Sequence, residues 1–215
     1  MISSLLHLVY PALCLHCKAL LFSHKKLLCS DCLEMLTLID PKTRCIKCFK
    51  ESGLKVCGQC RKRPSKYKQL AACFEHFGPA ISLAHAFKNR IYLDQVLASW
   101  MVVQMEQAGF PLPQLILSFP CTVVDKILEG YHRARLLADK IGEFYQVPVR
   151  DLLLKSQEGE FSLKKQVDFS GQTILLVVEE VSALEPIVQC VRLLNDSMIY
   201  IIACNYVEID CYNRK

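Results

Sequence analysis

Eight cysteines in the first 60 residues form four Cys-x-x-Cys pairs, and this spacing is typical of metal ligation. The pairs are Cys14/Cys17, Cys29/Cys32, Cys45/Cys48 and Cys57/Cys60. Each two-residue spacer presents two thiolates on one side of a tight turn, and two such turns give the tetrahedral sulfur site that suits Zn²⁺. The pattern predicts about two zinc ions, and their role is expected to be structural because four protein sulfurs leave no open coordination position.

The order of the pairs leaves two ways of combining them. Sequential pairing builds one zinc ribbon from the first two pairs and another from the last two, whereas interleaved pairing mixes them. The 12 residues between Cys32 and Cys45 are enough for each half to fold alone. Redox-active dithiols are a further alternative for this spacing. Metal binding supplies folding free energy, so zinc would also explain how a segment with little apolar core becomes ordered.

A strongly basic segment overlaps the second half of the cysteine region. Residues 42–68 hold ten Lys or Arg and one acid, Glu51, a balance of +9 in a chain whose formal charge is +5. Zinc with four thiolates carries about −2, so part of this charge is local compensation. The remainder predicts a phosphate-backbone surface for single-stranded DNA or another nucleic acid, with Phe49 and Tyr67 as base-stacking rings; the alternative is a solvated basic linker. The predicted contact residues are Lys47, Lys50, Lys55, Arg61, Lys62, Arg63, Lys66 and Lys68.

Beyond residue 65 the cysteine pairs stop, and apolar strand patterns alternate with helical ones. The predicted strands cover residues 69–78, 114–120, 147–155, 172–180 and 198–209. The predicted helical regions are 79–109, as one or two helices, 125–146, interrupted or started at Gly130, and 186–194. This alternation predicts an α/β fold with a mainly parallel sheet, in which ligands bind at the carboxyl ends of the strands. We therefore expect two domains, a small double zinc ribbon over residues 1–65 and an α/β domain over residues 66–215.

Two adjacent carboxylates, Glu179 and Glu180, end the strongest predicted strand. A short loop with Ser182 follows, and Pro186 begins the next helix. Strand, acidic pair, loop and helix is the layout of a nucleotide or phosphate site, yet this loop lacks the glycine that lets a backbone approach a phosphate. The pair is therefore interpreted as the remains of a ligand site. The alternatives are a solvated strand end, another ligand or a metal.

The composition favours a cytoplasmic protein without membrane insertion. No apolar run approaches the roughly 20 residues that a bilayer span requires. Residues 1–14 are apolar but have no lysine or arginine ahead of them, so they are expected to form a mature turn or helix and not a signal peptide. The 13 cysteines, an odd number, argue for reduced thiols in the cytosol.

Several stretches resemble the ComF/GntX group of competence-associated, phosphoribosyltransferase-like proteins. They are LLHLVYPALCLHC near the start, FGPAISLAHAFKNRIYLDQVLASWM, LILSFP and LEGYHRARLLADKIGEFYQVP, in the order that the group has them. The resemblance covers nearly the whole chain. It implies a double zinc ribbon followed by a type I phosphoribosyltransferase-like domain, and a role in DNA uptake or processing beside competence or DNA-processing proteins.

The group's catalytic motifs are altered in this chain. Where the group has Arg-Gly-Phe-Asn-Gln, this chain has Glu-Gly-Tyr-His-Arg at 129–133. Where the group has Asp-Asp-Val-x-Thr-Thr-Gly-x-Thr, this chain has Glu-Glu-Val-Ser-Ala-Leu-Glu-Pro-Ile at 179–187, which places Glu185 at the glycine position. The resemblance implies a phosphoribosyl diphosphate site at Glu179, Glu180 and Ser182. The altered loop predicts impaired catalysis; the alternative is an active phosphoribosyltransferase with an atypical loop, which would also use Mg²⁺.

Overall fold

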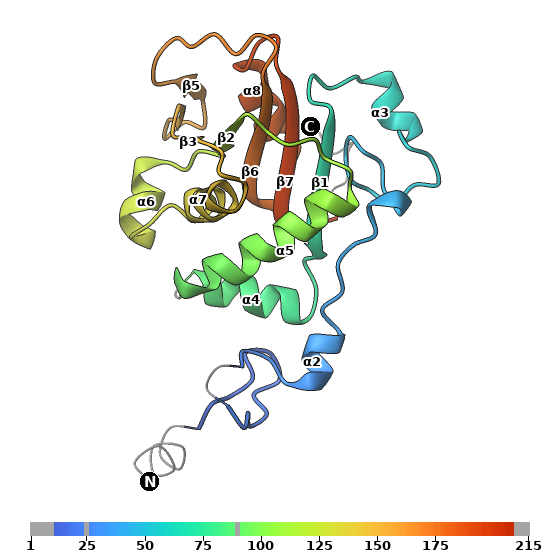
Figure 1. Ribbon diagram of the computed structural model, residues 1–215, viewed down its shortest axis with the longest axis vertical. Helices are drawn as coiled ribbons and strands as arrows, with labels where there is room; N and C mark the ends of the chain where they lie inside the picture. Colours follow the sequence, from blue (N-terminus) through green and yellow to red (C-terminus); the bar gives the residue numbers. More distant parts are fainter. Residues whose placement is uncertain (1–10, 24–25, 89–90, 209–215) are drawn as a thin grey trace.

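The computed structural model describes residues 11–23, 26–88 and 91–208 (Figure 1). The expected N-terminal turn or helix lies largely outside these described residues. Within them, no helix combines the length and the apolar character that crossing a membrane requires.

A parallel sheet of five strands forms the centre of the protein, in the order β1-β7-β6-β2-β3. Every neighbouring pair runs parallel, which confirms the predicted sheet. The strands are β1 (Gln69–Glu75), β2 (Leu115–Ser118), β3 (Val149–Arg150), β6 (Thr173–Val181) and β7 (Met198–Tyr206). The near-continuous apolar stretches of β6 and β7 are what burial on both faces of a parallel sheet requires.

Helices lie on both faces of this sheet, and those that pack on it are α5 (Asp94–Gln107), α7 (Arg133–Tyr145) and α8 (Glu185–Arg192). The others are α4 (Pro79–Phe87), a short helix η2 (Ile91–Leu93) before α5, and α6 (Val123–Glu129) before α7. α5 and α7 pack on each other and on the sheet (Figure 1). The β6–α8–β7 crossover runs along the sheet in the opposite direction to the β1–α5–β2 crossover, so right-handed connections place α8 on the opposite face.

The predicted helical region over 79–109 consists of α4, η2 and α5 in the structure. The region over 125–146 is interrupted at Gly130, one of the two expected forms, because Gly130 ends α6 in the left-handed conformation with φ 77° and α7 follows. The single strand predicted over 147–155 was wrong: only β3 joins the sheet, and β4 (Leu153–Lys155) pairs antiparallel with β5 (Phe161–Leu163). β5 was not predicted, since its three residues are too short to show a clear alternation.

The N-terminal region consists of two cysteine-bearing loops joined by an extended linker. The first loop includes α2 (Ser30–Glu34) and the second includes α3 (Gly58–Lys62), and a short helix η1 (Pro41–Thr43) lies in the linker. The linker and second loop cover the edge strand β1: Ile39 N donates to Cys73 O at 2.9 Å, and Leu70 N donates to Ile46 O at 2.8 Å. Ile39 also belongs to the same buried core as the sheet. The domain boundary at residue 65 stays a prediction.

Close packing at Gly142 of α7 generates a stability prediction. A Cβ there would lie 2.9 Å from the Val147 carbonyl oxygen and would overlap the Val149 side chain. Alanine normally stabilises a helix relative to glycine by about 1 kcal/mol, but overpacking here should reverse the sign and lower the free energy of unfolding by about 1–3 kcal/mol. Denaturant unfolding of Gly142→Ala measures this. Gly53→Ala is the control, because no atom lies within 4 Å of its added Cβ; equal midpoints would contradict the prediction.

Candidate functional site

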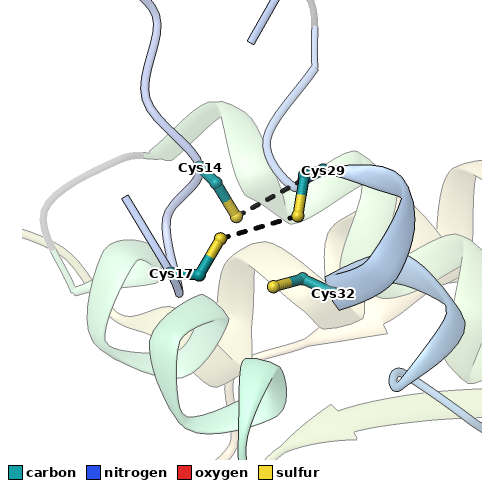
Figure 2. A group of neighbouring side chains, drawn as sticks. All are labelled: Cys14, Cys17, Cys29 and Cys32. Atoms are coloured by element: carbon teal, nitrogen blue, oxygen red, sulfur yellow. Dashed lines mark hydrogen bonds between the residues drawn. The ribbon is translucent and has the colours of Figure 1, made fainter. Parts of the chain in front are cut away.

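The first cysteine cluster contains Cys14, Cys17, Cys29 and Cys32, whose sulfur atoms all lie within 4.8 Å of one another (Figure 2). The second contains Cys45, Cys48, Cys57 and Cys60 at the same spacing. The structure therefore pairs the cysteines sequentially and not in the interleaved way. Each cluster offers four sulfur ligands, a donor set that fits one structural Zn²⁺.

Both clusters are built in the same way from the backbone. The residue after the second cysteine, Lys18 in one and Phe49 in the other, adopts the left-handed conformation with φ 63° and φ 62°. This turns the chain back on itself, so that Cys14 N bonds Ala19 O at 2.8 Å and Cys45 N bonds Lys50 O at 2.9 Å. Glycine is the usual residue at positive φ. Because these two positions hold Lys18 and Phe49 instead, the sequence gives no sign of the turns.

The third cysteine of each cluster begins a helix and points its backbone N–H at the first cysteine. Cys29 N lies 3.4 Å from Cys14 Sγ and precedes α2, and Cys57 N lies 3.3 Å from Cys45 Sγ and precedes α3. The fourth cysteine then lies within the first turn of that helix. Backbone N–H groups stabilise a negatively charged sulfur, as they do in other anion sites at helix N-termini.

One thiol in each cluster is predisposed to ionise and another resists it. A hydrogen bond from the Cys48 thiol, with backbone N–H groups, lowers the pKa of Cys45 to about 4. Burial raises the pKa of Cys14, but backbone N–H groups, Cys29 first, bring it down to about 6. Burial raises the pKa of Cys32 and of Cys60 to about 12. A divalent cation is what would let all four sulfurs of a cluster carry charge together.

The two clusters differ in how they join the rest of the protein. The second shares the main core: the Phe49 ring packs edge-on against Tyr206 with centroids 5.6 Å apart, and Arg44 forms an ion pair with Glu75 at 2.5 Å. The first forms a small separate core with Leu83 of α4, and His16 Nδ1 lies 3.0 Å from Ser82 Oγ. In Figure 1 it lies beyond α4, away from the sheet.

Most of the predicted nucleic-acid residues lie on the surface of the second cluster and α3. Lys55, Arg61, Lys62, Arg63, Lys66 and Lys68 are exposed, and Lys50 is half-buried with Glu208 at 3.8 Å. Lys47 differs, because its ammonium group donates to the Tyr67 carbonyl and lies 5.4 Å from the centre of the Tyr67 ring. Burial also lowers the pKa of Lys47.

The expectation that Phe49 and Tyr67 stack on bases was wrong. Each ring is only 1% exposed. Phe49 packs in the core, and the Tyr67 hydroxyl donates to the Lys47 carbonyl, so both rings hold the second cluster against the sheet. Their position in a basic stretch suggested a surface role, but an apolar ring is buried wherever a small module must attach to a larger core.

Basic side chains from elsewhere in the chain contact the acidic pair at the end of β6. Arg133, the first residue of α7, donates from Nε to Glu179 Oε2 at 2.5 Å, with the two side chains 14% and 20% exposed. His76, directly after β1, places Nδ1 3.2 Å from Glu180 Oε2, which is ion-pair distance without hydrogen-bond geometry. Neither partner was predicted, although both follow from parallel strands whose carboxyl ends meet at one edge.

The loop after the acidic pair holds Ser182 on the surface and leads into α8. α8 begins at Glu185, one residue earlier than predicted, and Pro186 occupies its second position. Glu185 lies in the first turn, where a carboxylate interacts favourably with the helix dipole. The positive end of α8 thus faces a carboxylate of the protein itself.

The clusters generate a prediction about metal content. We expect about two Zn²⁺ per chain; Cys17→Ser and Cys48→Ser should each reduce this to about one, as measured by elemental analysis. Cys48→Ser should also lower Tm more than Cys17→Ser, since the second cluster shares the main core. Zinc affinity should fall as pH falls, because binding displaces the protons of Cys32 and Cys60, whose pKa values are raised.

Cys121→Ser is the control for this experiment, because Cys121 lies outside both clusters and the variant should keep the full metal content. A metal content near zero in protein purified without chelator, with all eight paired thiols freely titratable, would contradict the zinc assignment.

Comparison with known proteins gives one sequence match. No protein-family model matches the chain. Competence protein F of Haemophilus influenzae (strain ATCC 51907 / DSM 11121 / KW20 / Rd) is 24% identical over 150 residues, which cover 66% of this chain and 64% of that protein. The matched region is therefore less than two thirds of the relative's own length.

Solved structures show weaker likenesses. The purine phosphoribosyltransferase from Pyrococcus horikoshii Ot3 matches with TM-score 0.39 and 10% identity, over 58% of this chain and 92% of that chain. The hypoxanthine phosphoribosyltransferase of Trypanosoma cruzi matches with TM-score 0.32 and 14% identity, over 57% of this chain and 68% of that chain. Phosphoribosylpyrophosphate synthetase from Mycobacterium smegmatis matches with TM-score 0.33 and 15% identity, over 54% and 33%.

The similarity to ComF-like proteins rests on the sequence match and on the paired clusters, not on these structural scores. Two four-cysteine clusters precede a parallel sheet, which is the order of parts expected from the resemblance. Together with the match to Competence protein F, they support the expected resemblance of this chain to ComF-like proteins, from which its sequence diverges.

Proposed function

We propose that this protein acts in DNA uptake or processing by binding single-stranded DNA through the surface of its second, zinc-loaded cluster. The observation that carries the proposal is the group of exposed basic side chains on and after α3. Arg61 and Lys62 lie in the last turn of α3 and Arg63 follows it, while Lys66 and Lys68 lead into β1. A basic surface of this kind neutralises phosphates without reading the sequence of bases.

The cluster would hold this surface in place. Cys57 precedes α3 and Cys60 lies within it, so a metal at this cluster fixes the helix that carries Arg61 and Lys62. Lys68 N donates to Ile199 O at 2.7 Å, which attaches the other end of the segment to the sheet. A segment fixed at both ends loses little conformational entropy when it binds a strand.

We further propose that the carboxyl edge of the sheet no longer binds phosphoribosyl diphosphate productively. A ligand that used Glu179 would have to displace Arg133, and one that used the start of α8 would meet the charge of Glu185. Like charges at contact distance repel by about 1 kcal/mol even in water. In this proposal the Arg133–Glu179 ion pair would compete with the sugar, and the charge of Glu185 would disfavour the phosphate.

The alternative is an active phosphoribosyltransferase with an atypical loop, assisted by Mg²⁺. One observation favours it: two buried polar atoms near this edge, Ser118 Oγ and Asn205 Oδ1, have no hydrogen-bond partner among the described residues. Asn205 is the register partner of Glu180, so its side chain lies beside the acidic pair. Polar groups left in this state are found at ligand sites.

Competence or DNA-processing proteins are the proposed partners, by extension from the printed name of Competence protein F. The proposed compartment is the cytoplasm, since reduced cysteines that ligate zinc persist there.

Charge reversal tests the nucleic-acid proposal. Replacing Arg61, Lys62 and Arg63 with glutamate should weaken binding to a single-stranded oligonucleotide by at least about tenfold at low salt and reduce the slope of log affinity against log salt by about 2, at about 0.7 for each lost phosphate contact. Fluorescence anisotropy measures both. Reversal of Lys126, Lys164 and Lys165, which are exposed on other elements, is the control. Equal affinity in the two triple variants would show that the basic segment is a solvated linker.

Loop restoration tests the proposed loss of phosphoribosyl diphosphate binding. Calorimetry with phosphoribosyl diphosphate and Mg²⁺ should detect no binding by the unmodified protein. Ala183→Thr, Leu184→Thr and Glu185→Gly together should improve binding, because they add hydroxyls and remove a repelling charge; Pro186 limits the gain, since it has no donor N–H. Alanine at Glu179 and Glu180 should leave DNA binding unchanged. Micromolar, Mg²⁺-dependent binding by the unmodified protein that Glu180→Ala abolishes would instead establish the alternative.

A further inference from the structure

A cavity of about 240 Å³ lies between the linker of the two clusters and the end of β1. Among the residues that line it, Ile39 and Phe74 are buried, whereas Phe77 is 72% exposed and Met35 is 56% exposed. Its volume lies below the roughly 300–1,000 Å³ of pockets that take drug-sized ligands. A single ring system is therefore the size of ligand that it suits.

Phe77 is held at the mouth by the turn that starts α4. Phe77 N donates to Glu75 O at 2.7 Å, and Gly78, with φ 53°, turns the chain into the helix. A Cβ on Gly78 would lie 4.0 Å from Met35 Cε, so the thioether lies next to this turn. Met35 and Phe77 both line the cavity, and the exposed Phe77 ring offers a flat apolar surface on which another ring can stack.

The wall of the cavity carries carboxylates with unused hydrogen-bonding capacity. Glu75 Oε1 accepts from Arg44, and Asp40 Oδ1 accepts from Lys42 N at 2.9 Å. Neither Glu75 Oε2 nor Asp40 Oδ2 accepts a hydrogen bond from the described residues. These oxygens suit a ligand that presents N–H donors on one edge.

The cavity also opens at the start of the basic segment. Lys42 is exposed and close in sequence to Asp40. Arg44, which lines the cavity, pairs with Glu51 in a β-bridge, and Lys50 is the residue before Glu51. A polyanion drawn to these lysines would pass the mouth of the cavity. Its phosphates would stay outside, because Asp40 and Glu75 repel them.

We propose that this cavity binds one base of single-stranded DNA, stacked on Phe77, and that it prefers guanine; this inference rests on the proposed function. Guanine presents N1–H and N2–H₂ side by side, which gives one donor for each of the free oxygens of Glu75 and Asp40, and its O6 accepts from a cation such as Arg44. Thymine has one N–H between two carbonyl oxygens, which the carboxylates repel. The backbone contacts remain independent of sequence, and the cavity adds a preference for one base.

The test compares a twelve-residue oligo-dT with the same strand carrying one central dG, by fluorescence anisotropy. The unmodified protein should bind the dG strand about tenfold more tightly, and Phe77→Ala should remove most of this difference, since stacking on one ring contributes this order of affinity. Glu75→Gln should remove the preference while keeping an oxygen that Arg44 can bond. Phe144→Ala is the control, because its ring is 67% exposed on α7 and lies outside the cavity.

A second titration separates the cavity from the proposed function. Guanosine monophosphate should bind the unmodified protein more tightly than thymidine monophosphate in calorimetry, and Phe77→Ala should abolish this. If the protein binds oligo-dT but shows no preference for dG, and Phe77→Ala behaves like Phe144→Ala, the inference is overturned and the proposed function stands. If no oligonucleotide binds, the proposed function fails, and the inference that rests on it fails with it. Phe77-dependent binding of a lysine- and arginine-rich peptide, without nucleotide binding, would also overturn it.

Discussion

The N-terminal region depends on one electrostatic constraint: four sulfur atoms are held within 4.8 Å of one another, twice in succession. Four thiolates at such distances repel strongly, and four protonated thiols have few good hydrogen bonds to make. A bound Zn²⁺ resolves both difficulties, because it carries the opposite charge and takes all four sulfurs. The short helices α2 and α3, the left-handed turns at Lys18 and Phe49, and the linker between them all follow from positioning these sulfurs.

The second cluster connects the metal-binding region to the sheet. Phe49 and Tyr67 enter the main core, Arg44 pairs with Glu75 at the end of β1, and Leu70 bonds Ile46. The same contacts bring the basic residues of α3 beside the sheet and enclose the cavity near Phe77. The first cluster has fewer such attachments, and its own core meets the rest of the protein mainly through Leu83 of α4.

The long strands could be predicted from the sequence, because β6 and β7 are long apolar stretches. The two- and three-residue strands β3, β4 and β5 could not be resolved, because they are too short to show a pattern. The cysteine spacing predicted the eight ligands. It left open which two Cys-x-x-Cys pairs share a metal, because that depends on how two turns meet in space. The prediction for Phe49 and Tyr67 was wrong because it was based on the basic residues around them, and not on the tendency of their apolar rings to be buried. The partners of Glu179 and Glu180 lie far away in the chain, at 133 and 76, and only the topology of the sheet brings them to one edge.

The cover over β1 has a consequence for the protein without its metal. β1 is an edge strand, and an uncovered edge offers unpaired backbone groups to any other strand in solution. Here the cover is the linker and the second cluster, so a zinc ion in that cluster would also protect the edge of the sheet. If the metal is lost and the cover loosens, a strand with an apolar centre, Leu70–Phe74, becomes available for intermolecular pairing. We therefore expect zinc depletion to promote self-association through β1.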